Sequence, residues 1–369
     1  MIEAETINVS HDVPLTDFGI PIRNLWHMLL YAWNEPEMLQ QCEFEVESAP
    51  SLDALLAAIL VKIMQQRMRI GLGCSYVNEE VFLRGLRGRI DFAYSLKSRA
   101  FERGQAYCRF QQYKANAPKN QIIRSTLARL IQIGNFGPDQ TRAEELRHKL
   151  RRLTRDLEGI DLIDIDLEFI RRQKLGRNDS DYRLMLAICE LILQRQMPTE
   201  TEGRNKLPAL DRDALTLHYV YEKFVANFYK LHLHDWSIKP QSRFDWHASK
   251  TSIYLPSMQP DLVMQHNQSG RLVILDTKFT PNSLVNGRFG EPKFDSSHIY
   301  QLYAYLRSQE TLSEQHRVMP GILLYPAARY NLSEAVELQG HEVRFETVDL
   351  ALPWVDIGKR LMDLVADPI

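Results

Sequence analysis

The stretch from Tyr254 to Thr280 constrains the fold of this chain more than any other, and it reads YLPSMQPDLVMQHNQSGRLVILDTKFT. A short apolar run begins at Asp261 and is followed by a polar turn at residues 266–270 and by a β-branched, leucine-rich run. Two such runs joined by a polar, glycine-containing turn are typical of a β-hairpin. The second run ends in charged residues at 276–278, so we predict a buried strand that carries charge at its end.

The charged end of this hairpin is predicted to bring three ionisable side chains together. Side chains two residues apart on a strand share a face. Asp276 and Lys278 therefore point the same way, and Thr277 points to the other face. Because the hairpin returns the chain beside Asp261, we expect two carboxylates and one ammonium group at a single sheet edge.

Such a trio suits metal-assisted cleavage of phosphodiesters. Mg²⁺ is usually held by one or two carboxylates together with waters and substrate phosphates. The metal polarises the scissile phosphate and activates water, and a neighbouring lysine can orient that water or stabilise the developing charge. The alternative interpretation is a surface hairpin whose terminal charges are solvated, because short motifs also occur by chance.

The same residues resemble a known signature. The dipeptide PD at 260–261 and the tripeptide DTK at 276–278 are similar to the motif of the PD-(D/E)XK nuclease superfamily. This resemblance implies that Asp261 and Asp276 bind the metal and that Lys278 assists the attack.

Composition limits how the chain can meet nucleic acid. The net charge of −2 provides no overall attraction to a polyanion, so any contact with DNA must come from local basic patches.

The four cysteines are scattered and form no CxxC pair, which is typical of reduced thiols in a cytoplasmic protein. They are Cys42, Cys74, Cys108 and Cys189. The polar segment 1–19 has no signal-peptide features and is predicted to be a flexible arm. The longest apolar segment, residues 52–64, is too short to cross a membrane.

Three helices are expected in the N-terminal half. Apolar residues recur at helical spacing at 23–33, 51–68 and 121–130. Asn24 and Asn120 precede the apolar positions of the first and the third helix, so we predict that they are N-caps.

Between the second and third of these helices the pattern changes to strand-like runs around residues 76–83 and 90–92. The segment that joins them contains two glycines and a concentration of positive charge. Its arginines are Arg84, Arg87 and Arg89. Two interpretations stay open, a solvated basic hairpin or a surface that contacts phosphate on DNA or on a nucleotide held by another subunit.

Two charged segments follow, and neither requires a functional explanation. Residues 141–156 are predicted to form a solvated helix with ion pairs along its surface. In residues 157–169 apolar and acidic residues alternate, which predicts a half-exposed strand. This alternation accounts for Asp161, Asp164 and Asp166 without a metal site.

Elements on either side of the hairpin provide further candidate residues. A helix is predicted at 181–196, and another at 217–231 carries Glu222. Glu222 could add a carboxylate near the metal, although a helix glutamate is more often solvated. The glycine-containing loop 282–293 carries two basic residues that suit contact with a phosphate backbone. They are Arg288 and Lys293.

A helix after the hairpin begins at about His298 and places Gln301 and Tyr305 on one face, because they are four residues apart. This QxxxY pattern resembles the supporting helix of RecB-like members of the superfamily. The resemblance implies that Gln301 helps to orient the catalytic residues and that Tyr305 contacts DNA. The alternative is a tyrosine-rich amphipathic helix that packs on the sheet.

Three longer blocks resemble a more specific family. IPIRNLWHMLLYAW, GLRGRIDF and NAPKNQIIRSTL, in this order and ahead of the PD and DTK motifs, are similar to the McrC family, the nuclease subunits of McrBC modification-dependent restriction systems. The likeness extends from about Ile20 to the C-terminus. It implies an endonuclease that acts with a separate McrB-type AAA+ GTPase hexamer, which binds GTP and recognises DNA carrying 5-methylcytosine. The chain has no GxxxxGK[ST] phosphate loop of its own, which agrees with a nucleotide bound by the partner.

We therefore expect a mixed α/β (α+β) chain with three parts. These are the flexible arm (1–19), an N-terminal partner-docking domain (20–170) and a PD-(D/E)XK endonuclease domain (171–369) with a central mixed sheet flanked by helices. The expected function is Mg²⁺-dependent cleavage of double-stranded DNA by two copies acting together, with Arg84, Arg87 and Arg89 contacting the partner. The alternatives are a non-catalytic adaptor that activates an AAA+ ring and a stand-alone RecB-like repair nuclease.

Overall fold

The computed structural model describes residues 19–36, 49–176, 179–196, 209–246, 252–280, 283–286, 290–327 and 331–366. The chain forms two compact units, Leu52–Met197 and a second unit that combines Met1–Ser51 with Pro198–Ile369. Within the described residues, no helix is both long and apolar enough to cross a bilayer. The predicted flexible arm lies outside the described residues apart from Gly19.

The two units do not match the predicted domains, which divide the chain between residues 170 and 171. Helix α1 (Ile22–Ala32) packs on helix α9 (Ala209–His232) and so belongs with the C-terminal segment. Helix α8 (Ser180–Gln196) packs on helices of the middle segment and belongs with them. The sequence order of the elements therefore does not correspond to their grouping in space.

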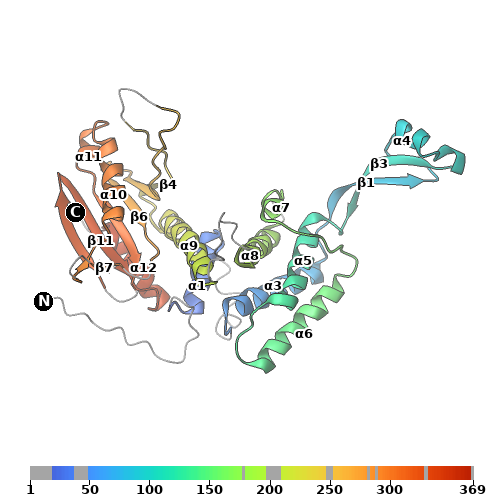
Figure 1. Cartoon of the computed structure of the whole chain (residues 1–369), viewed down its shortest axis with the longest axis horizontal. Coiled ribbons are helices and arrows are strands. Elements are labelled where there is room, and N and C mark those ends of the chain that lie inside the picture. Colours follow the sequence, from blue (N-terminus) through green and yellow to red (C-terminus); the bar gives the residue numbers. More distant parts are fainter. Residues whose placement is uncertain are drawn as a thin grey trace. The chain divides into compact units, whose positions relative to one another are not determined.

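The C-terminal unit contains a six-stranded sheet in the order β10-β11-β9-β6-β5-β4 (Figure 1). Its strands are β4 (Trp236–Pro240), β5 (Leu262–His266), β6 (Leu272–Thr277), β9 (Gly321–Pro326), β10 (Ser333–Leu338) and β11 (His341–Val348). β6, β9 and β11 run parallel to one another, and the other strands pair antiparallel with their neighbours. The predicted hairpin is β5–β6, and the predicted mixed sheet flanked by helices is confirmed.

β6 is a central strand in which all six residues are buried. A strand covered on both faces must be apolar on both, which explains its continuous apolar run. On one face Leu272 and Ile274 join Leu302 of helix α10 (Ser296–Gln309) in one hydrophobic cluster. The helix approaches closely because β9 begins with Gly321, where a Cβ would lie 2.8 Å from Leu302 Cδ2.

Asn24 does not cap helix α1 as predicted. The helix begins earlier, at Ile22, and the Asn24 amide donates hydrogen bonds to the carbonyl oxygens of Leu350 (2.7 Å) and Leu352 (2.8 Å). These carbonyls immediately precede helix α12 (Trp354–Ala366). The buried asparagine therefore fastens the first helix to the last part of the chain.

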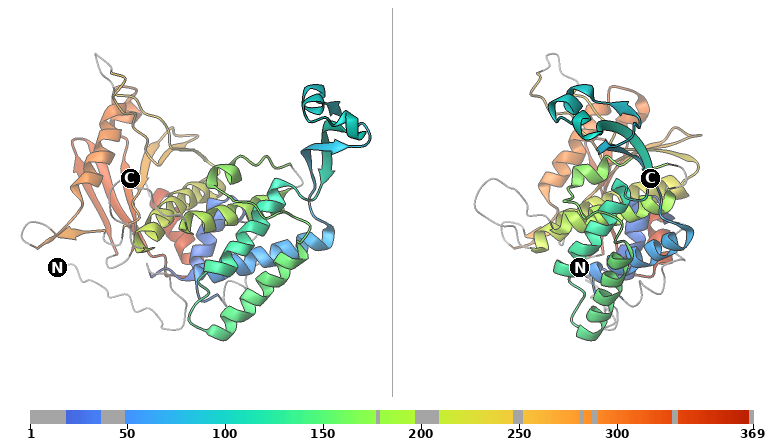
Figure 2. Two further views of the ribbon diagram at one scale, coloured as in Figure 1. Left: turned by 45° about the vertical axis from the view of Figure 1, so that its right-hand side comes forward. Right: turned by 90° about the vertical axis from the view of Figure 1, so that its right-hand side faces the viewer.

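The middle unit is a helical bundle that carries a small sheet (Figures 1 and 2). Its helices are α3 (Leu52–Ile70), α5 (Pro118–Ile133), α6 (Gln140–Asp156), α7 (Leu167–Arg171) and α8, and its strands are β1 (Ser75–Leu83), β2 (Arg89–Ile90) and β3 (Ala106–Lys114). α3, α5, α6 and α8 pack against one another. The helices predicted at 51–68, 141–156 and 181–196 are confirmed almost residue for residue.

The strand predicted at 157–169 is wrong. Residues 161–166 have no regular structure, and helix α7 follows them. Asp166 caps this helix, because its carboxylate accepts a hydrogen bond from the Phe169 N–H at 2.7 Å. Asp161 accepts a hydrogen bond from the Asn116 side chain at 2.6 Å. Asp166 thus satisfies a local backbone donor, which favours a helix cap over a strand, whereas the donor to Asp161 lies 45 residues away.

Residues 75–114 form an arm, made of β1, β2, β3 and the short helix α4 (Phe92–Lys97), that extends from the bundle (Figure 1). β1 and β2 lie on opposite edges of β3, so residues 84–88 do not close a hairpin between them. Gly88 is required in this connection because its φ is +65° and a Cβ would lie 2.4 Å from the Arg109 carbonyl oxygen.

The root of the arm is held by a buried hydrogen-bond network. Asn120, predicted to cap a helix, lies inside α5, and its amide donates to the carbonyl oxygens of Gly73 (2.9 Å) and Ala115 (2.7 Å). Tyr182 donates to the Asn120 side-chain oxygen (2.7 Å) and accepts from the Gly73 N–H (2.8 Å). One asparagine therefore ties together the two chain segments that enter and leave the arm.

This network generates a stability prediction. The change Tyr182→Phe removes the hydroxyl and leaves a buried N–H and a buried amide oxygen without their partner, which costs about 1–3 kcal/mol. We expect urea unfolding monitored by circular dichroism to show this loss. The matched control Tyr113→Phe, at a side chain that is 62% exposed, should leave the free energy of unfolding unchanged. Equal stability of the Tyr182→Phe variant and the wild type would contradict the role of the network.

Candidate active site

Asp276 is a carboxylate buried near the end of a central strand. It lies on β6, is 1% exposed, and stands opposite Asp261 in the register that pairs Leu262 with Leu275. Burial and then the negative charge of Asp261 raise the pKa of Asp276 to about 6, and the ammonium group of Lys278 opposes both effects. The two carboxylates therefore interact electrostatically across the hairpin.

Lys278 follows β6 directly and its side chain returns to Asp276. Its backbone N–H donates to the Leu324 carbonyl oxygen of β9 at 2.9 Å, which fixes the end of the strand. Its ammonium group forms an ion pair with the Asp276 carboxylate and donates to the Gln301 side-chain oxygen at 2.8 Å. Asp276 and Lys278 thus meet on one side of the strand, as the alternation predicts.

Gln301 and Tyr305, one turn apart on α10, hold the ammonium group in place. The Gln301 amide nitrogen donates to the Tyr305 hydroxyl at 2.7 Å, so the amide oxygen of Gln301 faces Lys278. The Tyr305 hydroxyl donates in turn to the Gln259 carbonyl oxygen at 3.2 Å. Burial raises the pKa of Tyr305 to about 12, which keeps this phenol protonated.

Tyr305 does not offer the surface that its predicted contact with DNA requires. Its side chain is 5% exposed, and its hydroxyl is occupied by Gln301 and Gln259. Gln301, by contrast, is exposed where it meets Lys278. The pattern QxxxY therefore supplies one residue at the surface of the site and one that supports it from below.

Asp261 is anchored by Thr277, which lies between Asp276 and Lys278 in the sequence. Its Oδ2 accepts hydrogen bonds from the Thr277 N–H at 2.7 Å and from the Thr277 hydroxyl at 2.6 Å. Strand β5 begins only after Asp261, so the carboxylate takes the backbone donor that a longer strand would have satisfied.

Glu222 lies near the two aspartates. It is 8% exposed on α9 and accepts a hydrogen bond from the Gln241 amide at 2.8 Å. Burial raises the pKa of Glu222, and the charge of Asp261 adds to the effect. Its electrostatic influence also reaches Asp276.

Two aspartates in this site fit a magnesium ion. Within the described residues, no group of three or more His, Cys, Asp or Glu side chains is arranged to hold a metal. Mg²⁺ does not need such a group, because one or two carboxylates with waters and substrate oxygens suffice. Asp276 Oδ2 is buried, and within the described residues its one close partner is the Lys278 ammonium group. An oxygen in this condition can serve a cation together with Asp261.

Three residues at the site have no role that the sequence motifs predict, and they are Thr277, Gln241 and His298. The His298 Nδ1 lies 3.1 Å from the Tyr325 hydroxyl, and burial and the nearby Lys278 charge lower the pKa of this histidine. Its position three residues before Gln301 places it on the same helix face, and this spacing was the available signal.

The remaining predicted residues lie elsewhere. Arg288 falls outside the described residues, and Lys293 lies in a short ribbon of β7 (Val285–Asn286) and β8 (Pro292–Lys293), where it pairs with Glu291 at 2.7 Å. The arginines of the arm lie in the middle unit and are exposed. Their predicted contacts with DNA and with a partner stay predictions.

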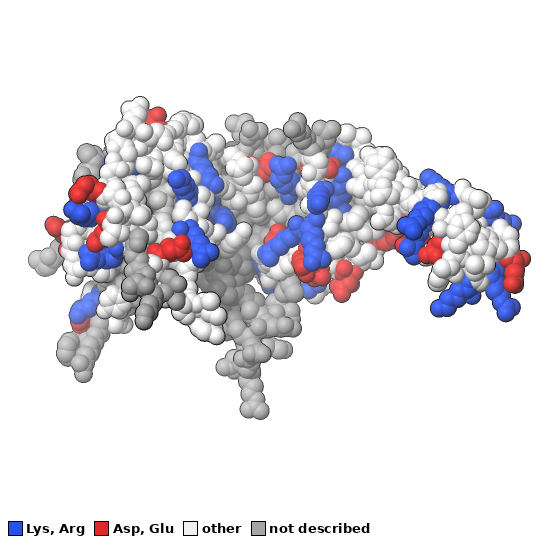
Figure 3. All heavy atoms as spheres, turned by 90° about the horizontal axis from the view of Figure 1, so that it is seen from above, with Lys and Arg blue, Asp and Glu red and all other residues white. Residues whose placement is uncertain are grey.

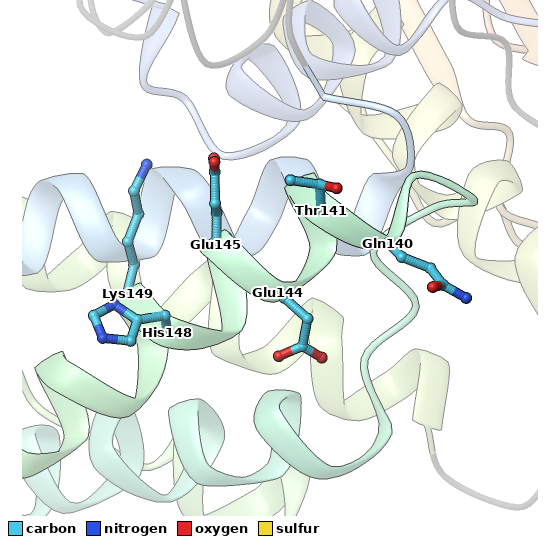
Figure 4. A pocket seen from close by; sticks show the side chains of 6 residues that line it. All are labelled: Gln140, Thr141, Glu144, Glu145, His148 and Lys149. Carbon is cyan, nitrogen blue, oxygen red and sulfur yellow. The ribbon is translucent and has the colours of Figure 1, made fainter.

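A hollow on the exposed side of α6 is separate from this site. It is lined by Gln140, Thr141, Glu144, Glu145, His148 and Lys149 (Figure 4). Glu144 and Glu145 point to different sides of the helix in this view, and Glu144 pairs with Arg147. Because its polar groups do not converge, we assign the hollow no function.

Comparison with known proteins places the chain in a family. The sequence model of the family described as "McrBC 5-methylcytosine restriction system component" matches residues 6–326. The chain belongs to this family. A McrBC relative is the type IV methyl-directed restriction enzyme EcoKMcrBC of Escherichia coli K12, which is 27% identical over 349 residues, or 94% of this chain and 97% of that protein.

The McrBC fold is also found among solved structures. A similar chain occurs in the half-complex of a tetradecameric assembly of Thermococcus gammatolerans McrB AAA+ hexamers with bound McrC. The TM-score is 0.54 with 14% sequence identity, and the match covers 94% of this chain and 76% of that chain. At this level of identity the likeness supports the fold.

The raised pKa of Asp276 predicts how the stability of this McrBC family member depends on pH. The folded state binds the Asp276 proton more tightly than the unfolded state, so this residue lowers stability as pH rises from about 4 to about 6. In urea unfolding with EDTA present, Asp276→Asn should gain on the order of 2 kcal/mol relative to the wild type across this window. A difference between the two proteins that does not change with pH would contradict the assignment.

Proposed function

We propose that this chain is the Mg²⁺-dependent DNA endonuclease subunit of its McrBC restriction system. One observation supports the proposal most strongly: Asp276 is buried opposite Asp261, and the Lys278 ammonium group lies against its buried Oδ2. A strongly shifted carboxylate beside a specific charge partner is characteristic of functional sites. The description of the Escherichia coli relative as a restriction enzyme agrees with this chemistry.

The two aspartates are the proposed metal ligands, with Glu222 as a third carboxylate near them. When bound, Mg²⁺ supplies Lewis-acid polarisation of the scissile phosphodiester. The side chains of the site provide the hydrogen-bond donors. The Lys278 ammonium group has three N–H donors, and Asp276 and Gln301 engage two of them. The third can donate to the attacking water or to a phosphate oxygen, where negative charge develops.

Gln301 and Tyr305 give this lysine a fixed orientation. A lysine side chain is flexible, and holding it costs conformational entropy. The hydrogen bonds from Lys278 to Gln301, from Gln301 to Tyr305 and from Tyr305 to the Gln259 carbonyl oxygen supply that restraint before substrate arrives. Preorganised donors of this kind reduce the reorganisation that the reaction requires.

The arm is the proposed docking element for an AAA+ GTPase hexamer, which would bind the GTP. Lys and Arg side chains gather at its outer end, at the right of Figure 3. The exposed basic residues of the arm include Arg84, Arg87, Arg89, Lys97, Arg99 and Arg103. Large apolar side chains stand beside them, with Leu86 73%, Phe92 62% and Leu96 67% exposed. Exposed large apolar side chains beside basic ones suit a protein–protein contact.

Relatives support this partner. The Thermococcus gammatolerans chain with the same fold is described as McrC bound to McrB AAA+ hexamers. We extend this arrangement to the present chain by analogy of fold. The proposal includes two copies of the chain acting together on double-stranded DNA, so that each copy cuts one strand.

The nuclease proposal predicts a clean separation of two activities. The change Asp276→Ala removes a metal ligand, so cleavage of methylated plasmid in the presence of the GTPase partner, GTP and Mg²⁺ should fall at least about 1,000-fold. Stimulation of the partner's GTPase activity should stay intact, because the arm is unaltered. The control Asp245→Ala changes a carboxylate that is 78% exposed in the same unit and should cleave normally.

The outcomes distinguish the candidate functions. Retained cleavage by Asp276→Ala would contradict the proposed site. Loss of both activities would indicate that Asp276 is structural. A wild-type chain that stimulates the GTPase but cleaves no DNA under any metal condition would favour the adaptor, and cleavage without partner or nucleotide would favour the stand-alone nuclease.

The docking proposal predicts the converse separation. Reversing the charge of Arg84, Arg87 and Arg89 to glutamate should weaken binding to the GTPase partner and lower its stimulation at least about tenfold, since charge complementarity governs such contacts. Mn²⁺ affinity of the chain should not change. The matched control reverses Arg142, Arg151 and Arg155 on α6, which are also exposed, and should bind the partner normally. Equal effects of the two triple variants would contradict a specific role of the arm.

A further inference from the structure

We infer that the Thr277 hydroxyl is a positioning group that holds Asp261 in the orientation needed to bind a divalent cation. The inference rests on the proposed function and concerns a residue that the DTK motif leaves unassigned. In this inference the middle residue of the motif orients a metal ligand, while Asp276 and Lys278 keep the roles proposed for them above.

The geometry at Thr277 supports this role. Both its backbone N–H and its hydroxyl donate to the same carboxylate oxygen, Asp261 Oδ2, at 2.7 and 2.6 Å. Two donors from one residue fix the carboxylate in position and in rotation. Among the hydrogen bonds of the described residues, none involves Asp261 Oδ1, so this oxygen is left to accept a cation.

Electrostatic repulsion makes such an anchor necessary. Asp261 stands opposite Asp276 in the register of the hairpin, and the charges of the two carboxylates act on each other. The Gln241 N–H donates to the Asp261 carbonyl oxygen at 2.9 Å, which fixes the main chain but not the rotation of the side chain. Without an anchor, the Asp261 carboxylate can therefore turn away from Asp276. Metal-binding carboxylates are commonly held in orientation by hydrogen bonds from residues that do not themselves bind the metal.

The competing interpretation is that Thr277 serves packing alone. The side chain is 1% exposed, and a β-branched residue is favoured in any strand. Valine has nearly the same shape as threonine but no hydroxyl, whereas serine keeps the hydroxyl and loses the methyl group. These two substitutions therefore separate the hydrogen bond from the packing.

The experiment measures Mn²⁺ binding to the full chain by isothermal titration calorimetry, without DNA or partner. The wild type is compared with Thr277→Val, Thr277→Ser and Thr277→Ala, and urea unfolding confirms that each variant is folded. Loss of an outer contact to a metal ligand typically weakens binding 10–100-fold. We expect this loss for the valine and alanine variants and an affinity within about threefold of the wild type for the serine variant.

Each outcome of the Mn²⁺ titration either supports or contradicts the role of the Thr277 hydroxyl. Wild-type affinity in Thr277→Val would overturn the inference, and so would a serine variant as weak as the valine variant, because packing would then explain both. If valine is not tolerated in the fold, the alanine and serine variants make the same comparison. A wild type that binds no Mn²⁺ would overturn the proposed metal-dependent function itself, and the wild-type measurement separates this outcome from the others.

Discussion

Asp276 brings a carboxylate into the centre of a sheet, where both burial and the facing Asp261 oppose its charge. A buried charge without compensation is among the most costly features that a fold can contain. The ion pair between Lys278 and the buried Oδ2 of this carboxylate offsets part of the cost. Several neighbouring residues hold the groups that surround this buried carboxylate. Gln301 and Tyr305 hold the lysine, and Thr277 holds the second aspartate.

The scaffold explains why these groups meet where they do. β6 lies between the antiparallel strand β5 and the parallel strand β9, so its carboxyl end is a place where the chain directions of its two neighbours differ. Open α/β sheets bind ligands outside the carboxyl ends of their strands, and Asp276 lies near this end of β6. Because β5 begins only at Leu262, the Asp261 carboxylate accepts the hydrogen bond from the Thr277 N–H that the backbone of a longer strand would accept. α10 then covers one face and supplies the amide that receives the lysine.

Sequence periodicity predicted the elements that carry the site and failed where distant partners decide a residue's role. The hairpin, the buried strand and the spacing of Gln301 and Tyr305 follow from local patterns, and the structure contains them. Asn24 and Asn120 have the residue type of a helix cap, but their amides bond carbonyls 326 and 47 residues away. Asp166 alternates like a strand residue and caps a helix. Nothing in a short window of sequence shows which donor or acceptor the folded chain will bring to such a side chain.

The central claim is that Asp261 and Asp276 share one divalent cation beside Lys278. Anomalous diffraction from crystals of the chain soaked in Mn²⁺ tests it most directly. The account predicts one strong peak bonded to a carboxylate oxygen of each aspartate, at the distance expected for a hard cation with oxygen ligands. A peak that is absent from this position while Mn²⁺ occupies another site, or one that contacts neither aspartate, would contradict it.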